Sequence, residues 1–71
     1  MKAKVIMVSG SREKEAELND LVRKVQTETS MKAYPNVDYG AVFFPTDKHD
    51  LSFLKRVLKD KGFSFKVEDA E

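Results

Sequence analysis

The chain has 71 residues, 41% hydrophobic and 35% charged, which excludes a disordered chain and leaves room for one small domain. Its net charge of +1 gives no overall field that would attract nucleic acid or an anionic membrane. The absence of cysteine excludes disulfides and cysteine metal sites and favours a cytoplasmic location. No apolar run approaches the ~20 residues of a membrane span, so we expect no membrane partner.

The first part of the chain predicts a strand followed by a helix. Residues 1–9 alternate in polarity at their start, and charged residues follow where a signal peptide would need a cleavage site. From Arg12 the apolar residues take helical spacing, and Ser11 is the candidate N-cap. The buried stripe of this helix is expected to be Leu18, Leu21, Val22 and Val25.

The middle of the chain predicts a hairpin of two strands, residues 29–34 and 37–44. Thr29, Met31 and Ala33 share one face when read with a period of two. The segment Tyr34-Pro35-Asn36-Val37 has the residue types of a β-turn. The alternative is that the helix continues to about residue 29 and a loop follows it.

The last part predicts a second helix and a fourth strand. Pro45 ends the preceding strand, Thr46 or Asp47 can cap the helix, and Gly62 can stop it. The expected apolar stripe of this helix comprises Leu51, Leu54, Val57 and Leu58, with Phe53 beside it. In the strand, Phe63, Phe65 and Val67 alternate with polar residues, and residues 69–71 are expected to fray.

This order of elements predicts a single α+β domain over residues 1–71, with the ferredoxin-like βαββαβ arrangement. Right-handed crossovers would place both helices on one face of a four-stranded antiparallel sheet and leave the other face open. If the hairpin does not form, the alternative is a three-stranded βαβαβ sheet with the same helices.

The faces of the first and third strands are ambiguous, because residues 37–44 are apolar at both alternating sets of positions. Gly40 would admit a helix closely, so we expect the set Gly40, Val42 and Phe44 to face the core. For the first strand, we expect Ala3, Val5 and Met7 to face the core. The open face would then carry Ile6, Val8, Tyr39, Ala41 and Phe43, joined by Lys32 and Tyr34.

Apolar residues on an open face, in a chain too small to bury them alone, predict a non-enzymatic interaction or regulatory module, such as an inhibitor. We expect it to bind a protein partner, or itself as a homodimer. The predicted partner-binding residues are Ile6, Val8, Tyr34, Tyr39 and Phe43.

Part of the third strand resembles the signature of RNA-recognition-motif domains. The segment VDYGAVFF matches that signature at Tyr39, Gly40, Val42 and Phe44, and differs from it at Val37, Asp38 and Ala41. The resemblance covers only residues 37–44 and assigns no family. It implies an alternative function, single-stranded nucleic-acid binding, in which Tyr39, and also Tyr34, would stack on bases. Phosphates would then contact Lys2, Lys4, Lys32 and Lys66.

Other constellations favour ordinary structural roles, and no metal, cofactor or catalytic residue is predicted. Asp47 and Asp50 beside His49 suit a helix N-terminus without a metal. The segment 9–12 lacks the glycine patterns of nucleotide-binding loops. The basic flank Lys48, Lys55, Arg56 and Lys59 favours a solvated helix face. A small enzyme is the third and least favoured interpretation, because no nucleophile and base stand out.

Overall fold

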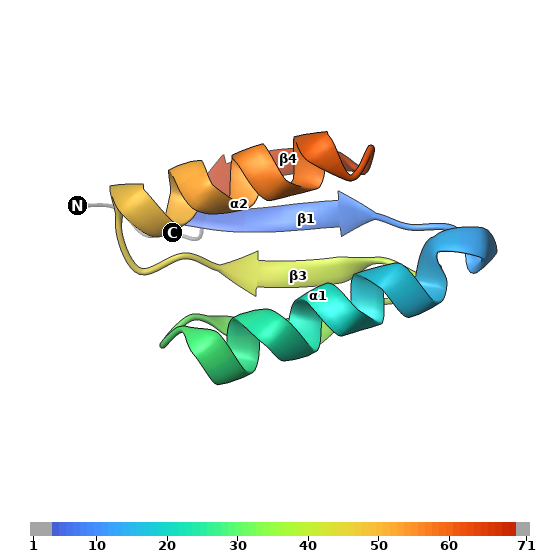
Figure 1. The fold of residues 1–71 in the computed structure, drawn as a ribbon. Helices are drawn as coiled ribbons and strands as arrows, with labels where there is room; N and C mark the ends of the chain where they lie inside the picture. The colour runs from blue at the N-terminus through green and yellow to red at the C-terminus, as the bar shows by residue number, and fades with distance from the viewer. Residues whose placement is uncertain (1–3, 70–71) are drawn as a thin grey trace.

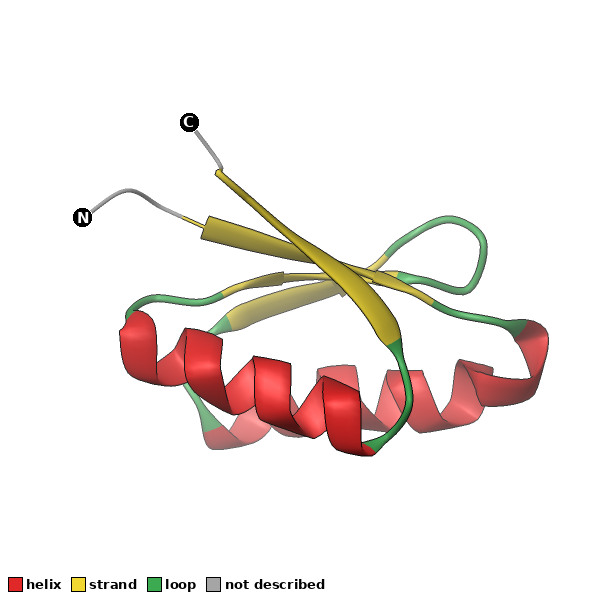
Figure 2. Cartoon of the chain, turned by 90° about the horizontal axis from the view of Figure 1, so that it is seen from above, coloured by secondary structure: helices red, strands yellow, loops and turns green. Residues whose placement is uncertain are grey.

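A computed structural model of the chain describes residues 4–69, so Lys2, Ala3 and residues 70–71 of the predictions above lie outside the described residues. One antiparallel sheet has the strand order β2-β3-β1-β4, and both helices lie on the same side of it (Figures 1 and 2). This is the predicted α+β, ferredoxin-like βαββαβ arrangement. The elements are β1 (Lys4–Ser9), the 3-10 turn η1 (Arg12–Lys14), α1 (Glu15–Glu28), β2 (Lys32–Pro35), β3 (Ala41–Phe44), α2 (Lys48–Asp60) and β4 (Ser64–Asp69).

Helix α1 buries the predicted stripe, namely Leu18, Leu21, Val22 and Val25. The stripe ends at Val25, but the helix continues to Glu28. The Thr29 hydroxyl then donates to the Val25 carbonyl at 2.7 Å and accepts from the Met31 N–H at 3.0 Å. These two bonds turn the chain into β2. Ser11 stands directly before η1, but its side chain makes no capping hydrogen bond.

Helix α2 begins and ends with the predicted residues. The Asp47 carboxylate accepts from the Asp50 N–H at 2.9 Å, while the Asp50 carboxylate accepts from the Thr46 hydroxyl and N–H. At the other end Gly62 has φ +78°, the Gly62 N–H donates to the Lys59 carbonyl, and the Phe63 N–H donates to that of Leu58. This pairing is a Schellman motif, which positions α2 and the start of β4 together.

The side chain of Lys14 ties the start of α1 to the end of α2. Its ammonium donates to the carbonyls of Lys61 at 2.8 Å and Gly62 at 3.2 Å. The same nitrogen lies 4.7 Å from the ring centroid of Phe63. A cation near a helix C-terminus interacts favourably with the negative end of the helix dipole. A cation over an aromatic ring adds a cation–π contact.

The hairpin forms, but the predicted position of its turn is wrong. The turn spans Val37 to Gly40, with the Gly40 N–H donating to the Val37 carbonyl at 3.1 Å. Asp38 and Tyr39 have φ values of +56° and +62°, the sign pattern of a type I′ turn. Pro35 stays in β2 because an edge strand can lack one N–H donor. Tyr39 therefore lies in the loop and not on a strand.

The predicted faces of β1 and β3 are wrong. Ile6, Val8, Ala41 and Phe43 are buried under the helices, whereas Met7 and Phe44 are exposed. The cross-strand register explains this result, since directly paired residues share a face of the sheet. Ile6 pairs with both Phe43 and Val67, and Val8 pairs with both Ala41 and Phe65. Because Phe65 and Val67 of β4 point to the core as predicted, their partners on β1 must do so too.

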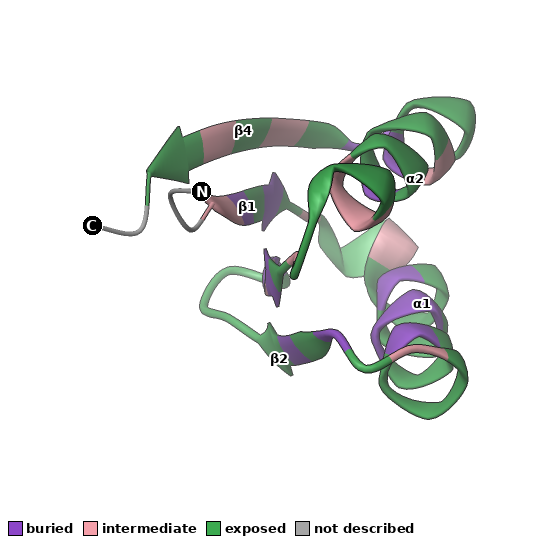
Figure 3. Cartoon of the chain, turned by 90° about the vertical axis from the view of Figure 1, so that its left-hand side faces the viewer, coloured by how far each residue is buried: buried purple, intermediate pink, exposed green. Residues whose placement is uncertain are grey.

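Two glycines bring backbone segments together, and Gly40 adjoins the backbone of β1 and not a helix, contrary to the prediction. A Cβ on Gly40 would lie 2.5 Å from the carbonyl oxygen of Val8, and a Cβ on Gly10 would lie 1.8 Å from that of Tyr39. These glycines thus let the loop of residues 36–40 pack against the end of β1. The loop rises on the side of the sheet opposite the helices (Figures 2 and 3).

Strand β4 is longer than expected. It runs to Asp69, whose carboxylate accepts from the Lys4 ammonium, so the prediction of fraying at residue 69 is wrong. Residue 69 is held in the strand because Asp69 pairs with Lys4 where β1 begins and β4 ends. Over residues 4–69, neither helix is both long and apolar enough to cross a membrane.

Candidate functional site

The sheet surface opposite the helices consists of two rows of side chains, which we call the open face. Strand alternation and register define both rows. From β2 to β4, the first row is Tyr34, Val42, Met7 and Lys66. The second row is Lys32, Phe44, Val5 and Glu68, with Val5 placed by continuing the register of β1 and β3. No element in the described part of the chain covers this surface (Figure 2).

The centre of the open face is apolar. Tyr34 is 50% exposed, Met7 40% and Phe44 38%, while Val5 and Val42 are half-buried. The rings of Tyr34 and Phe44 make an edge-to-face contact with centroids 5.9 Å apart. Figure 3 shows that residues of different burial alternate along strands of the sheet. The five apolar residues thus form a continuous patch on a solvent-facing surface, where polar residues would be expected.

The charged residues of the open face lie at its two edges. Lys32 is on the β2 edge, and Lys66 and Glu68 are on the β4 edge. All three are exposed, and none has an ion-pair partner among residues 4–69. The face therefore has the apolar centre and polar rim that are typical of a protein interface.

The structure brings only some of the predicted site residues together. Tyr34, Lys32 and Lys66 lie on the open face. Three predicted members, Ile6, Val8 and Phe43, are buried in the core instead. Tyr39 is 41% exposed but belongs to the loop at the edge of the face, where its backbone has positive φ.

The remaining predicted nucleic-acid contacts do not gather on the open face. Lys4 has the same strand parity as Ile6, which places it on the helix side, and it pairs with Asp69. Lys2 lies outside the described residues. The sequence reasoning missed Val5, Met7, Val42 and Phe44 as members of the open face. Cross-strand pairing could have identified them. Directly paired residues share a face of the sheet, so the inward residues of β4, which are unambiguous, fix which residues of β1 and then of β3 point outward.

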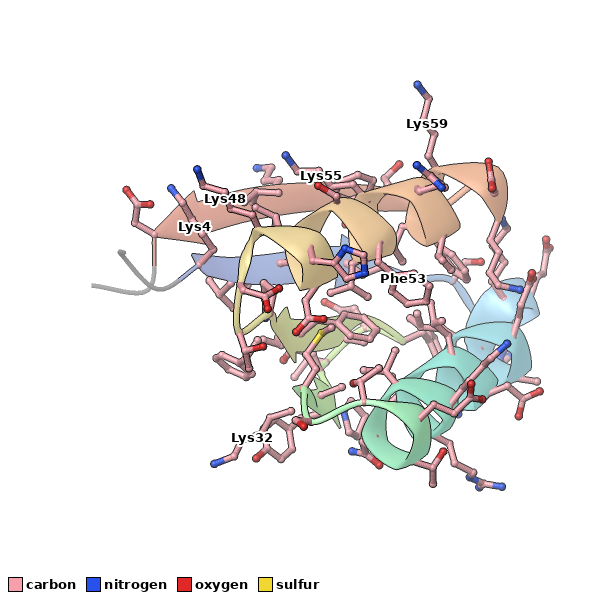
Figure 4. All side chains as sticks on the ribbon, turned by 60° about the vertical axis from the view of Figure 1, so that its left-hand side comes forward. Lys4, Lys32, Lys48, Phe53, Lys55 and Lys59 are labelled. Carbon is pink, nitrogen blue, oxygen red and sulfur yellow. The ribbon has the colours of Figure 1, made fainter. Side chains whose placement is uncertain are left out.

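A second concave surface lies between the two helices, as a groove of about 730 Å³. Its apolar floor includes Leu21, Val25 and Val57, and Phe53, which is 43% exposed, also lines it. Figure 4 shows Phe53 on the side of α2 near α1, and Lys48, Lys55 and Lys59 on the other side. The carboxylates along the groove are Glu17, Asp20, Glu28, Asp50 and Asp60.

The groove is acidic overall, since only Lys24 and Lys61 offset its carboxylates, and the Lys61 ammonium lies 3.9 Å from Glu17. His49 also lines it. Within residues 4–69, however, no three histidine, cysteine or acidic side chains are grouped closely enough to hold a metal ion. The acidic and apolar side chains of the groove suit a binding partner whose surface carries cationic and apolar side chains.

Comparison of the chain with protein-family models finds no match. The curated proteins and the solved structures likewise contain no match to it. The two candidate binding surfaces of the molecule are therefore the open face of the sheet and the groove between the helices.

Proposed function

We propose that the chain is a non-enzymatic interaction module that binds a protein partner through the open face of its sheet. The observation that carries this proposal is the continuous patch of Val5, Met7, Tyr34, Val42 and Phe44 on the uncovered side. Aromatic residues and methionine are enriched in the centres of protein interfaces, and lysine is depleted there. Here the lysines lie on the edge strands β2 and β4, while Phe44 lies on the inner strand β3 and Met7 on the inner strand β1.

Covering this face would contribute favourable free energy to binding. Complete burial of a Phe, Met or Val side chain contributes about 1.5–3 kcal/mol. Phe44 and Met7 are only partly buried in the chain, so a partner that covers them would gain part of that amount. The charged edges would act mainly on orientation and on association rate.

The groove between the helices offers a matched control, because it also holds a partly exposed aromatic residue. Phe44 is 38% exposed on the open face and Phe53 is 43% exposed on the helix side. The wild-type chain, Phe44→Ser and Phe53→Ser can each be immobilised and incubated with lysate of the producing cells. Mass spectrometry then quantifies each captured protein.

The proposal expects one protein to be captured equally by the wild type and by Phe53→Ser, and at least tenfold less by Phe44→Ser. Circular dichroism must first show that both variants fold. Loss of capture in Phe53→Ser with full capture in Phe44→Ser would transfer the function to the groove. Equal capture by all three chains would contradict a role for the open face.

Single-stranded nucleic-acid binding is a second candidate, favoured by one observation. Tyr34 and Phe44 form an exposed edge-to-face pair, and Lys32 pairs directly with Phe44 across the strands. Base stacking on an aromatic side chain contributes about 1–3 kcal/mol, and a neighbouring lysine can contact phosphate. The stacking residues would therefore be Tyr34 and Phe44 in place of Tyr39.

Fluorescence anisotropy with labelled oligonucleotides tests this candidate. We expect binding at low salt to weaken steeply as salt increases and to drop at least tenfold in Tyr34→Ala. The control Tyr39→Ala should bind like the wild type, because Tyr39 lies outside the two rows. An unchanged anisotropy up to millimolar chain would rule out this candidate.

A further inference from the structure

We infer that the partner of the open face is a second copy of this chain, related by a two-fold axis that runs along the strands between β1 and β3. This inference rests on the proposed function and names its partner. Such an axis stacks the two sheets face to face, with β2 of each copy over β4 of the other. Stacked sheets with nearly aligned strands are a common packing arrangement.

The charges of the second row are self-complementary under this axis. The row runs Lys32, Phe44, Val5, Glu68 from the β2 edge to the β4 edge. A two-fold axis through its middle places Lys32 of one copy opposite Glu68 of the other, and repeats that pair by symmetry. An interface between identical subunits requires such reciprocal pairing.

The apolar residues match in the same arrangement. Phe44 would face Val5 of the second copy, and Val42 would face Met7. Tyr34 would face Lys66, so that an aromatic ring meets a lysine stem and ammonium. Every apolar member of the two rows thus meets an apolar residue or a lysine stem.

The loop of residues 36–40 supplies a separate argument from shape. It rises on the open side at the β3 end nearest Ala41, and the axis places it over the ends of β1 and β4 of the second copy (Figure 3). The residues at those ends are Ser9 and Ser64, which pair directly and are both exposed. Their small side chains leave room for the loop, in which Val37 is 75% exposed.

The size of the face sets the expected strength. Four strands about 4.8 Å apart make it about 19 Å wide, and the shorter strands are about 14 Å long. Such a surface is smaller than a standard protein interface, which buries about 800 Å² on each partner. The dimer should therefore dissociate in the micromolar range or above, and it should be measured at several concentrations.

One other two-fold arrangement uses the same face. An axis perpendicular to the strands would place Glu68 opposite Lys66 of the second copy and would leave Lys32 opposite Tyr34. It would also place the loop over the end of β3 that carries Phe44. Charge reversal distinguishes the two arrangements.

Analytical ultracentrifugation of the full chain tests the inference, with Lys32→Glu, Glu68→Lys, Lys66→Glu and their equimolar mixtures. We expect Lys32→Glu alone and Glu68→Lys alone to dimerise at least tenfold more weakly than the wild type. Their mixture should recover dimers, because the first variant then offers two acidic sites to the two basic sites of the second. The double variant Lys32→Glu/Glu68→Lys should also dimerise like the wild type.

The perpendicular axis would replace ours if Lys32→Glu dimerised like the wild type and if mixing Lys66→Glu with Glu68→Lys restored dimer formation. A strict monomer at millimolar concentration would overturn the second copy as partner. The proposed function would still stand in that case if Phe44→Ser lost capture of another protein. Failure of both experiments would remove the open face as a binding surface.

Discussion

The two faces of the sheet differ little in composition and greatly in environment. The covered face takes Ile6, Val8, Ala41 and Phe43 from the two central strands, and the open face takes Val5, Met7, Val42 and Phe44. Each set holds one phenylalanine, and the other members are aliphatic residues or methionine. Hydrophobicity alone therefore does not explain which face the helices cover. The helices cover one face, and the apolar residues on the other face are available for binding.

The sharpest test of this comparison is the pair of neighbours Phe43 and Phe44. Phe43 is fully buried, so Phe43→Ala should lower the free energy of unfolding by about 3–5 kcal/mol. That amount is much of the stability of a small domain. Urea denaturation monitored by circular dichroism measures it.

The control for that experiment is Phe44→Ala, which should lower the free energy of unfolding of the monomer by only about 1 kcal/mol, because Phe44 is partly exposed and loses mainly its contact with Tyr34. If Phe44→Ala unfolded the chain while Phe43→Ala did not, the two faces would be exchanged. Both variants need denaturation at two protein concentrations, because self-association would add to apparent stability.

The loop beside the open face depends on Gly10. A Cβ there would lie 1.8 Å from the Tyr39 carbonyl oxygen, so Gly10→Ala must move one backbone segment. We expect a loss of about 3 kcal/mol, the upper end for overpacking. Ser9→Ala, at the exposed neighbouring position, should change stability by less than about 0.5 kcal/mol. Thermal melts of both variants would show whether the loop is anchored in this way, and equal melting temperatures would contradict it.

A smaller effect is expected from an isosteric pair on the same sheet. Val8→Thr buries a hydroxyl in the core and should cost about 2 kcal/mol, because a buried polar group without a partner is unfavourable. Val42→Thr makes the same change on the open face and should be within about 0.5 kcal/mol of the wild type. Denaturant midpoints compare the two. Similar losses in both variants would mean that Val42 is also covered.

The smallest expected effect concerns the helix that covers one side of the sheet. Asp47→Ala removes the carboxylate that accepts from the Asp50 N–H at 2.9 Å and should cost about 1 kcal/mol. Amide hydrogen exchange should become faster in the first turn of α2. Lys48→Ala, in the same turn but exposed, serves as the control. Unchanged exchange in Asp47→Ala would mean that the cap contributes nothing to the covering layer.

The order of the elements, the buried stripe of α1 and the inward residues of β4 follow from the sequence alone, as does the stripe of α2, in which Leu54 and Leu58 are buried and Leu51 and Val57 partly buried. Each of these has a clear period, and the ends of α2 have a specific chemistry in Asp47 and Gly62. Among the open-face residues, Lys32, Tyr34 and Lys66 could be predicted because they lie on the two edge strands, where one face is plainly polar or the alternation is unambiguous.

The faces of β1 and β3, in contrast, depend on how the strands pair in the folded sheet. Both strands are apolar on both sides, so a shift of one residue in register costs little locally and yet exchanges every side chain between the core and the open face. The pairing of Val8 with Phe65 and of Phe43 with Ala33 joins the central strands to edge strands whose faces are unambiguous. The turn was decided in the same way. Continuing the ladder through Pro35 and Ala41 required positive φ values at Asp38, whose residue type tolerates them, and at Tyr39, whose residue type does not predict one.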